Sequence, residues 1–343
     1  MTYVETVQGK LSVEDLGITL MHEHLFVDRS RLWEDPIGPK RRFAQSPVQM
    51  NMLGQLRLDP YGNYDNALMD DIDLATEEAS YFYNRGGATI VDVTNIGIGR
   101  DPWALYKVSR RTNLNIIMGS GFYLEPTMPE RIKSMTVDEV REEIVQDLTV
   151  GVNGTGIKAG IIGEIGVGPD MTDLEMKVLK GAARAQKDTG KILTIHTPGW
   201  EKHCHKILDV VEKEGANLEK TILDHMNPSM EDMEYQLALA KRGCYLEYDM
   251  IGIEVMFPEG QSPSDEDNAN AIVHLLEKGI GNQLLLSQDI FLKMFLKKYG
   301  GYGYSHILEN FVPRLKSKGV SDSEINQILV ENPKRCFSWN CGT

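Results

Sequence analysis

The chain has 343 residues, of which 41% are hydrophobic and 25% charged, and this balance excludes a wholly disordered protein. Its 50 acidic residues outnumber its 36 basic ones, giving a formal net charge of −14, which argues against nucleic acids and anionic membranes as main partners. The sequence contains no apolar run near the ~18 residues of a membrane span and no secretory signal at its start. Its four cysteines form no C-x-x-C pair, a pattern typical of reduced thiols. We therefore expect a soluble, cytoplasmic protein.

Short apolar runs bounded by turn residues recur along the whole chain and predict eight strands. These strands are expected at residues 17–22, 88–94, 114–118, 159–162, 191–195, 221–223, 244–248 and 283–286. Helical patterns fill the intervals between them. Capping boxes begin two of these helices, at Thr136 with Glu139 and at Thr172 with Glu175. Three further helices are expected to begin at Ser229, Ser264 and Ser321.

Strands that alternate with helices indicate a parallel sheet, and eight of them are the number that closes into a (β/α)₈, or TIM, barrel. An open doubly wound sheet is the alternative architecture, but it normally carries a glycine-rich G-x-G-x-x-G turn after its first strand. The sequence contains no such motif. It also contains no Pro/Ser-rich linker, so we interpret residues 1–343 as a single α/β barrel domain.

Metal-ligating residue types gather where the predicted strands end, which is the face of a barrel that carries its active site. They are His22 and His24 after strand one, Glu164 after strand four, His196 after strand five, His225 after strand six and Asp289 after strand eight. A lone histidine on an apolar strand is usually a hydrogen-bonded core residue, but six acceptable ligands at strand ends favour a divalent-metal site. The remaining histidines fall in predicted loops or helices and are assigned no metal role: His203, His205, His274 and His306.

Several segments resemble the phosphotriesterase family of the metal-dependent amidohydrolase superfamily: residues 7–9, 16–25, 156–162, 195–197, 224–225, 287–289 and 331–333. The resemblance implies a homodimer with two divalent cations per chain, zinc first and manganese or cobalt as alternatives. His22, His24 and Asp289 would hold one cation, and His196 and His225 the other.

The resemblance also implies an anionic side chain from strand four that bridges the two cations. Many members of the family use a carboxylated lysine, but the corresponding position here is Gly163. The sequence is similar to the phosphotriesterase homology protein branch, in which a glutamate takes this role, so Glu164 is the expected bridge. Because neighbouring strand residues point to opposite faces, Glu164 can turn inward only through a kink or bulge at Gly163.

The resemblance implies hydrolysis by a metal-bound hydroxide, with Asp289 as the proton acceptor. The residues proposed to relay protons in the phosphotriesterase are replaced here at Met226, Asn227 and Met250, so triester hydrolysis is not expected as the native activity. We expect a small lactone or carboxylic ester as substrate. The alternatives are a phosphoester hydrolase and a metal-bearing binding protein without turnover; a nucleotide-binding oxidoreductase would need the missing glycine motif.

Two residues are proposed to contact the substrate. Tyr123 matches a tyrosine that contacts substrate in lactonase relatives, and Lys293 lies in the loop after strand eight. The loop after strand one is basic, and it could hold a phosphate or carboxylate of the substrate, although most of its charges are expected to be solvated: Arg29, Arg31, Lys40, Arg41 and Arg42. Apolar pocket walls are expected from Trp33, Met250, Met256, Phe257 and Phe291.

Overall fold

The computed structural model describes residues 2–33, 35 and 41–338. Its centre is a parallel sheet of eight strands, which confirms all eight predicted strands. Each strand is a short run that is buried over most of its length, as expected of strands in a parallel sheet covered on both faces. The strands are β3 (Ile18–Glu23), β6 (Gly87–Asp92), β7 (Asn115–Ser120), β8 (Ile161–Gly166), β9 (Leu193–His196), β10 (Thr221–Leu223), β11 (Tyr245–Tyr248) and β14 (Leu284–Leu286).

The strands follow one another around the sheet in the order β14-β11-β10-β9-β8-β7-β6-β3, so the chain order is kept and the sheet is nearly closed into a barrel. At the seam, the Asp289 amide donates to the His22 carbonyl at 3.2 Å, and the His22 amide donates to the Ser287 hydroxyl at 3.0 Å. These bonds join the end of β3 to the segment after β14. The barrel expected from the sequence is confirmed.

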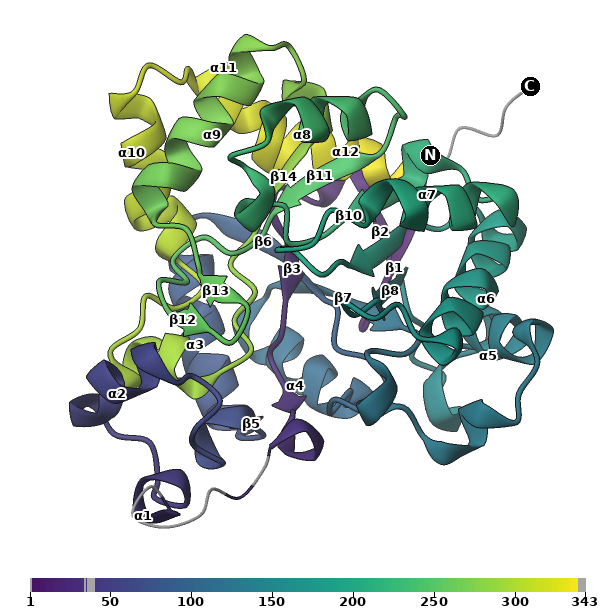
Figure 1. The fold of residues 1–343 in the computed structure, drawn as a ribbon, viewed down its shortest axis with the longest axis horizontal. Helices are drawn as coiled ribbons and strands as arrows, with labels where there is room; N and C mark the ends of the chain where they lie inside the picture. The colour runs from purple at the N-terminus through teal and green to yellow at the C-terminus, as the bar shows by residue number, and fades with distance from the viewer. Residues whose placement is uncertain (1, 34, 36–40, 339–343) are drawn as a thin grey trace.

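Helices surround the strands on the outside (Figure 1). The longer ones are α3 (Ile72–Asn84), α4 (Pro102–Thr112), α5 (Val137–Thr149), α6 (Asp173–Thr189), α7 (Cys204–Lys213), α8 (Met233–Ala240) and α9 (Asp265–Glu277). The shorter ones are α1 (Arg41–Ala44), α2 (Leu53–Leu58), α10 (Val312–Ser317), α11 (Asp322–Asn326) and α12 (Asn332–Phe337). The capping boxes predicted for α5 and α6 are both formed, and Ser264 and Ser321 begin α9 and α11 as expected.

The predicted helix start at Ser229 is wrong. Asp232 caps α8, and its carboxylate accepts from the Tyr235 amide at 3.0 Å. Ser229 ends the preceding 3₁₀ turn, where its hydroxyl donates to the Met226 carbonyl and accepts from the Gln236 side chain. The serine hydroxyl is therefore engaged by the preceding turn and by the Gln236 side chain and does not cap the helix.

An apolar layer fills the end of the barrel opposite the strand C-termini. It includes Met21, Val91, Ile117, Ile222 and Leu285 from the strands. The N-terminal hairpin β1 (Tyr3–Thr6) and β2 (Gly9–Ser12) and helix α12 cover this layer, contributing Val4 and Phe337 to the same cluster. Polar residues are thereby confined to the other end of the barrel.

The loops at the other end carry the remaining short elements. A long segment after β3 contains β4 (Val27–Asp28), paired with β5 (Leu68–Met69), together with α1 and α2. The hairpin of β12 (Met256–Phe257) and β13 (Gly260–Gln261) packs near α2, and Figure 1 shows these elements grouped on one side of the molecule. Within the described ranges, no helix is both long and apolar enough to cross a membrane.

Candidate metal centre

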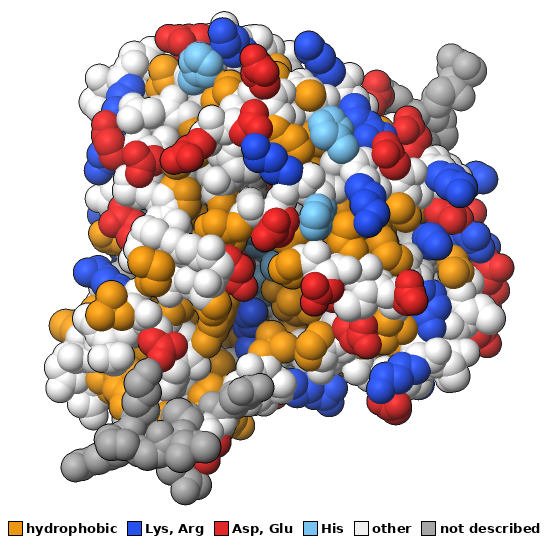
Figure 2. All heavy atoms as spheres, in the orientation of Figure 1, with side chains coloured by type: hydrophobic (Ala, Val, Ile, Leu, Met, Phe, Trp, Pro, Cys, Tyr) orange, Lys and Arg blue, Asp and Glu red, His pale blue; other side chains and the backbone are white. Residues whose placement is uncertain are grey.

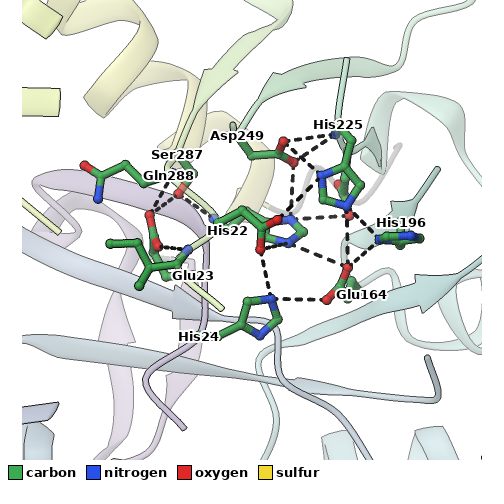
Figure 3. A network of polar contacts seen from close by, with 12 residues as sticks. His22, Glu23, His24, Glu164, His196, His225, Asp249, Ser287 and Gln288 are labelled. Atoms are coloured by element: carbon green, nitrogen blue, oxygen red, sulfur yellow. Dashed lines mark hydrogen bonds and ion pairs between the residues drawn. The ribbon is translucent and has the colours of Figure 1, made fainter. Parts of the chain in front are cut away.

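The end of β3 places two histidines inward and one glutamate outward. His22 and His24 point into the barrel mouth, while the Glu23 carboxylate accepts from the Ser287 hydroxyl, the Gln288 amide and the Ile290 amide at 2.8, 2.8 and 3.1 Å (Figure 3). Glu23 thus anchors the segment after β14 to β3. This alternation is what the period of a strand dictates.

Glu164 lies at the centre of the histidine cluster. Its oxygens are 3.1 Å from His196 Nδ1, 3.2 Å from His24 Nε2 and 3.6 Å from His22 Nε2. The expected irregularity at Gly163 is present: the register between β8 and β9 shifts between Ile162 and Ile165, and Gly163 has φ +118°. An added Cβ at Gly163 would lie 2.3 Å from the Thr194 carbonyl oxygen, so only glycine fits this turn.

His196 at the end of β9 and His225 after β10 form the other side of the cluster. His225 Nε2 is 2.7 Å from His196 Nδ1, and His225 has φ +57°. The Asp249 carboxylate accepts from the His225 amide at 2.9 Å and lies 3.0 Å from His225 Nδ1. Asp249 follows β11 directly, so a neighbouring strand end fixes the direction of the His225 ring.

Asp289 completes the ring of ligand candidates from the strand-eight side. Its Oδ1 lies 3.2 Å from His24 Nε2 and 3.6 Å from His22 Nε2. Its backbone has φ +46°, a conformation that non-glycine residues rarely adopt and that is common at functional sites. Six side chains from five strand ends therefore meet at one place.

Hydrogen bonds assign the tautomer of two histidines. The Thr94 hydroxyl donates to the Phe26 carbonyl at 3.0 Å, so it accepts from His24 Nδ1 at 2.8 Å. Likewise, the Asp249 carboxylate accepts from His225 Nδ1. In both rings Nδ1 is engaged, and Nε2 is the nitrogen that faces the cluster and can bind a cation once it has given up its proton. Carboxylate or hydroxyl contacts of this kind typically orient metal-ligating histidines.

These donors fit divalent cations. Four sets of described side chains hold their candidate ligand atoms within 4.8 Å of one another, and three of them consist of the expected ligands alone: His22, His24 and Glu164; His22, His225 and Asp289; and Glu164, His196 and His225. The fourth joins His22 to Asp224, Glu247 and Asp249. His22 is fully buried; its Nδ1 faces the Asp224 carboxylate at 3.4 Å, whereas its Nε2, which faces the cluster, has no hydrogen-bond partner. A buried polar atom without a partner is costly, and a cation would satisfy it. Imidazole and carboxylate are the ligands of zinc and similar ions.

The cluster is electrostatically poised for a cation. Burial alone would raise the pKa of Glu164, but the surrounding imidazoles hold it well below its usual range. Burial likewise opposes ionisation of Asp289, and His24 with His22 lowers its pKa instead. The two carboxylates are therefore ionised at neutral pH. Burial lowers the pKa of His196, and the neighbouring His225 lowers it further, which keeps this ring neutral as a ligand must be.

A cavity of about 140 Å³ opens directly above the cluster. Its walls include Tyr61, Tyr123, Met250, Phe257 and Phe291, and its floor includes His196, His225 and Asp289. Figure 2 shows a hollow near the middle of this face with hydrophobic side chains along its borders. Three of the five expected apolar wall residues, Met250, Phe257 and Phe291, line this cavity. Trp33 and Met256 are not among its described lining residues; Trp33 packs against Tyr64, and Met256 is exposed.

The two proposed substrate contacts have different placements. Tyr123 is buried at the cavity wall, with its hydroxyl 3.3 Å from His196 Nδ1. Lys293 is not among the described residues that line the cavity, and its ammonium pairs with Asp65 at 2.6 Å. We therefore withdraw Lys293 as a substrate contact, because its charge is already neutralised. Lys40 lies outside the described residues.

Sequence reasoning missed several residues at this site. Asp249 stands directly after β11, so the strand-end criterion that selected the other ligand candidates applies to it as well. Asp224 immediately precedes His225, and its Oδ2 lies 3.4 Å from His22 Nδ1. Tyr61 lines the cavity but comes from the long loop after β3, where no local pattern indicates the direction of a side chain. Arg29, from the same loop, was expected as one of its basic residues that could hold a substrate anion, and it also lines the cavity.

The chain matches the sequence model of the phosphotriesterase family over residues 2–337. It is 36% identical to the N-acetyltaurine hydrolase of Dictyostelium discoideum, over 98% of this chain and 97% of that protein. A resiniferatoxin-binding protein from Rhodobacter sphaeroides is 44% identical, with a TM-score of 0.97 over 98% of this chain and 95% of that one. A lactonase from Listeria monocytogenes is 26% identical, with a TM-score of 0.80 over 99% and 100% of the two chains. The chain belongs to the phosphotriesterase family.

Proposed function

We propose that this protein is a metal-dependent hydrolase that cleaves the acyl bond of a small substrate. The favoured substrate is an amide. The observation that carries the proposal is the convergence of four imidazoles and two carboxylates in one cluster, three of whose members, His196, His225 and Asp289, line the floor of a small, largely apolar cavity. His22, His24 and Asp289 would hold one divalent cation, His196 and His225 the other, and Glu164 would bridge them. Zinc suits this mixture of nitrogen and oxygen donors.

Divalent cations bound at these residues would lower the pKa of water to about 7 and polarise the substrate carbonyl. Asp289 is the residue placed to move the proton. Its carboxylate lines the cavity and is ionised at neutral pH. It would accept a proton as the water oxygen adds to the acyl carbon, and return it to the departing nitrogen as the C–N bond breaks. The products are a carboxylic acid and an amine, so no protein nucleophile is required.

Tyr123 would position the substrate. Burial raises the pKa of Tyr123 well above its usual value, so the phenol keeps its proton and remains a hydrogen-bond donor. Its hydroxyl lies beside His196 at the cavity wall. From this position it can donate to the substrate's carbonyl or leaving group, while the apolar walls keep bulk water, other than the attacking molecule, away from the reacting groups.

The similarity to an N-acetyltaurine hydrolase, which extends over nearly the full length of both chains, supports an amide substrate. The similarity to a lactonase supports a lactone or carboxylic ester as the second candidate. Both reactions place the same demands on the site, because each begins with attack on an acyl carbon.

The test is a substrate comparison with the zinc-loaded protein. N-acetyltaurine, an acyl lactone and a p-nitrophenyl phosphotriester are incubated with zinc-loaded and chelator-treated protein, and products are followed by mass spectrometry. We expect acyl cleavage that chelation abolishes and zinc restores. Asp265→Asn serves as a matched control for Asp289→Asn, because Asp265 pairs with His306 away from the cavity. Turnover of the phosphotriester alone, or of none of the three, contradicts the proposal.

A further inference from the structure

The cavity contains a cation that the chemistry described above does not use. Arg29 follows β4, and its side chain lines the cavity together with His196 and Asp289. It is half-buried, and its Nε is shielded from solvent without a hydrogen-bond partner. No carboxylate in the described part of the chain lies within 4.0 Å of its guanidinium. Its position therefore differs from that of an ordinary surface arginine.

Two other sheltered cations of the described structure have a carboxylate partner. Arg100 is almost fully buried and forms an ion pair with Asp147 at 2.8 Å, and Lys293 pairs with Asp65 at 2.6 Å. The chain has a surplus of acidic residues, so a carboxylate partner for Arg29 would be easy to supply. A sheltered charge without a counter-ion is costly unless something else supplies one. A substrate anion is such a partner.

Three aromatic rings hold the guanidinium in place. Arg29 Cζ lies 4.6 Å from the ring centre of Phe291, 5.3 Å from that of Tyr61 and 5.7 Å from that of Tyr123. These cation–π contacts restrict the orientation of the guanidinium fork, and its Nε still has no hydrogen-bond partner. A planar, fixed fork of donors matches the oxygens of a carboxylate or sulfonate. Arg29 is thus pre-organised for an oxyanion.

We propose that Arg29 is the specificity-determining residue of this site, and that it binds a sulfonate or carboxylate carried by the part of the substrate that leaves as the amine. This inference rests on the proposed function, since it assumes that the acyl group sits over the histidine cluster. The cavity of about 140 Å³ is small beside the ~300–1,000 Å³ of drug-sized pockets. It suits an acyl group joined to its anion by a short linker.

The test compares two amides that differ in charge alone. N-acetyltaurine carries a sulfonate, and N-(2-methylsulfonylethyl)acetamide is its neutral methyl sulfone. The ratio of their kcat/KM values is measured for the wild type and for Arg29→Met, Arg29→Lys and Arg31→Met. Arg31 is the matched control: it lies in the same loop, donates to the Thr127 carbonyl and is exposed. It is absent from the described lining of the cavity.

We expect the wild type to prefer the anionic amide. Arg29→Met should reduce that preference roughly 10- to 100-fold, mainly through KM, because a charge-assisted hydrogen-bonded pair is lost. Arg29→Lys should retain part of it, and Arg31→Met all of it. An equal fall for both amides would show that Arg29 acts on the acyl group instead, and would overturn the inference. A wild-type protein that does not prefer the anionic amide over the neutral one would also overturn the inference.

Calorimetric binding separates this inference from the proposed function. Ethanesulfonate and its neutral counterpart, ethyl methyl sulfone, are titrated into the zinc-loaded wild type and Arg29→Met. We expect the wild type alone to bind ethanesulfonate, and neither protein to bind the sulfone. If this holds while no amide is hydrolysed, the proposed function fails and the anion site stands. If amides are hydrolysed but ethanesulfonate binds both proteins equally, the anion site fails.

Discussion

Replacing Gly163 by alanine should distort the turn that directs Glu164 into the metal centre. The new Cβ would lie 2.3 Å from the Thr194 carbonyl oxygen and 2.7 Å from Thr194 Cγ2. At φ +118° an L residue is also strained, by ~1–3 kcal/mol, and overpacking adds ~1–3 kcal/mol. We expect the free energy of unfolding to fall by about 4 kcal/mol. With ~2.1 cal/mol/K of unfolding entropy per residue, the melting temperature should fall by roughly 5 °C.

The assay is thermal unfolding with chelator and with zinc. Gly154→Ala is the matched control, because Gly154 also has a positive φ, +72°, but no atom lies within 4 Å of its added Cβ. That variant should lose ~1–2 kcal/mol from strain alone and gain as much stability from zinc as the wild type does. Gly163→Ala should gain less from zinc, since Glu164 is displaced. Equal melting temperatures for the two variants, with equal zinc stabilisation, would refute the reasoning.

Three further outcomes are expected. Asp289→Asn preserves the size and shape of the side chain but removes the proton acceptor, so kcat should fall roughly 10²–10⁴-fold while most of the metal stays bound. A zinc-loaded variant with near-full activity would show that Asp289 is not the proton acceptor. Although burial lowers it, contacts with Asp289 and Glu164 raise the pKa of His24 to about 9. Zinc must then displace a proton from His24 at neutral pH, so the affinity of the protein for zinc should rise with pH up to about 9. Calorimetric titration of zinc in buffers of different ionisation enthalpy should detect the released proton. Zinc binding without proton release would contradict this prediction. Burial raises the pKa of the Cys244 and Cys336 thiols to about 12, so iodoacetamide should label them only after unfolding, and peptide mapping that finds them labelled in the native protein would be evidence against their burial.

The sequence predicted the strands well because each is a short apolar run that is buried along its length. The β7 run 116–118, for example, is completely buried. A short, wholly apolar run of this kind indicates a strand that is covered on both faces of a sheet. Local capping boxes likewise specified α5 and α6, since a cap is a contact between residues three apart. The start of α8 was misplaced because two residues close together, Ser229 and Asp232, can both cap a helix; Ser229 closes the preceding 3₁₀ turn instead, and Asp232 is the cap.

The candidate ligands could be predicted because a barrel brings all of its strand ends to one face. Glu164 needed one more observation, the glycine that allows the strand to turn. Arg29 could be counted among the basic loop residues but not distinguished from Arg31, since its neighbour Tyr61 stands far along the same loop and Phe291 belongs to the loop after β14. Lys293 was misjudged for the same reason, because its partner Asp65 belongs to another loop.

The metal content of the purified protein tests the central claim most directly. The protein is expressed with zinc supplied, dialysed, and analysed by mass spectrometry for metal per chain. Six ligands arranged for two cations predict about two zinc ions per chain, with fewer in Glu164→Gln, which keeps the size of the side chain but removes its charge. A wild-type protein that retains no metal, or a Glu164→Gln variant that keeps both ions with unchanged affinity, would contradict the account.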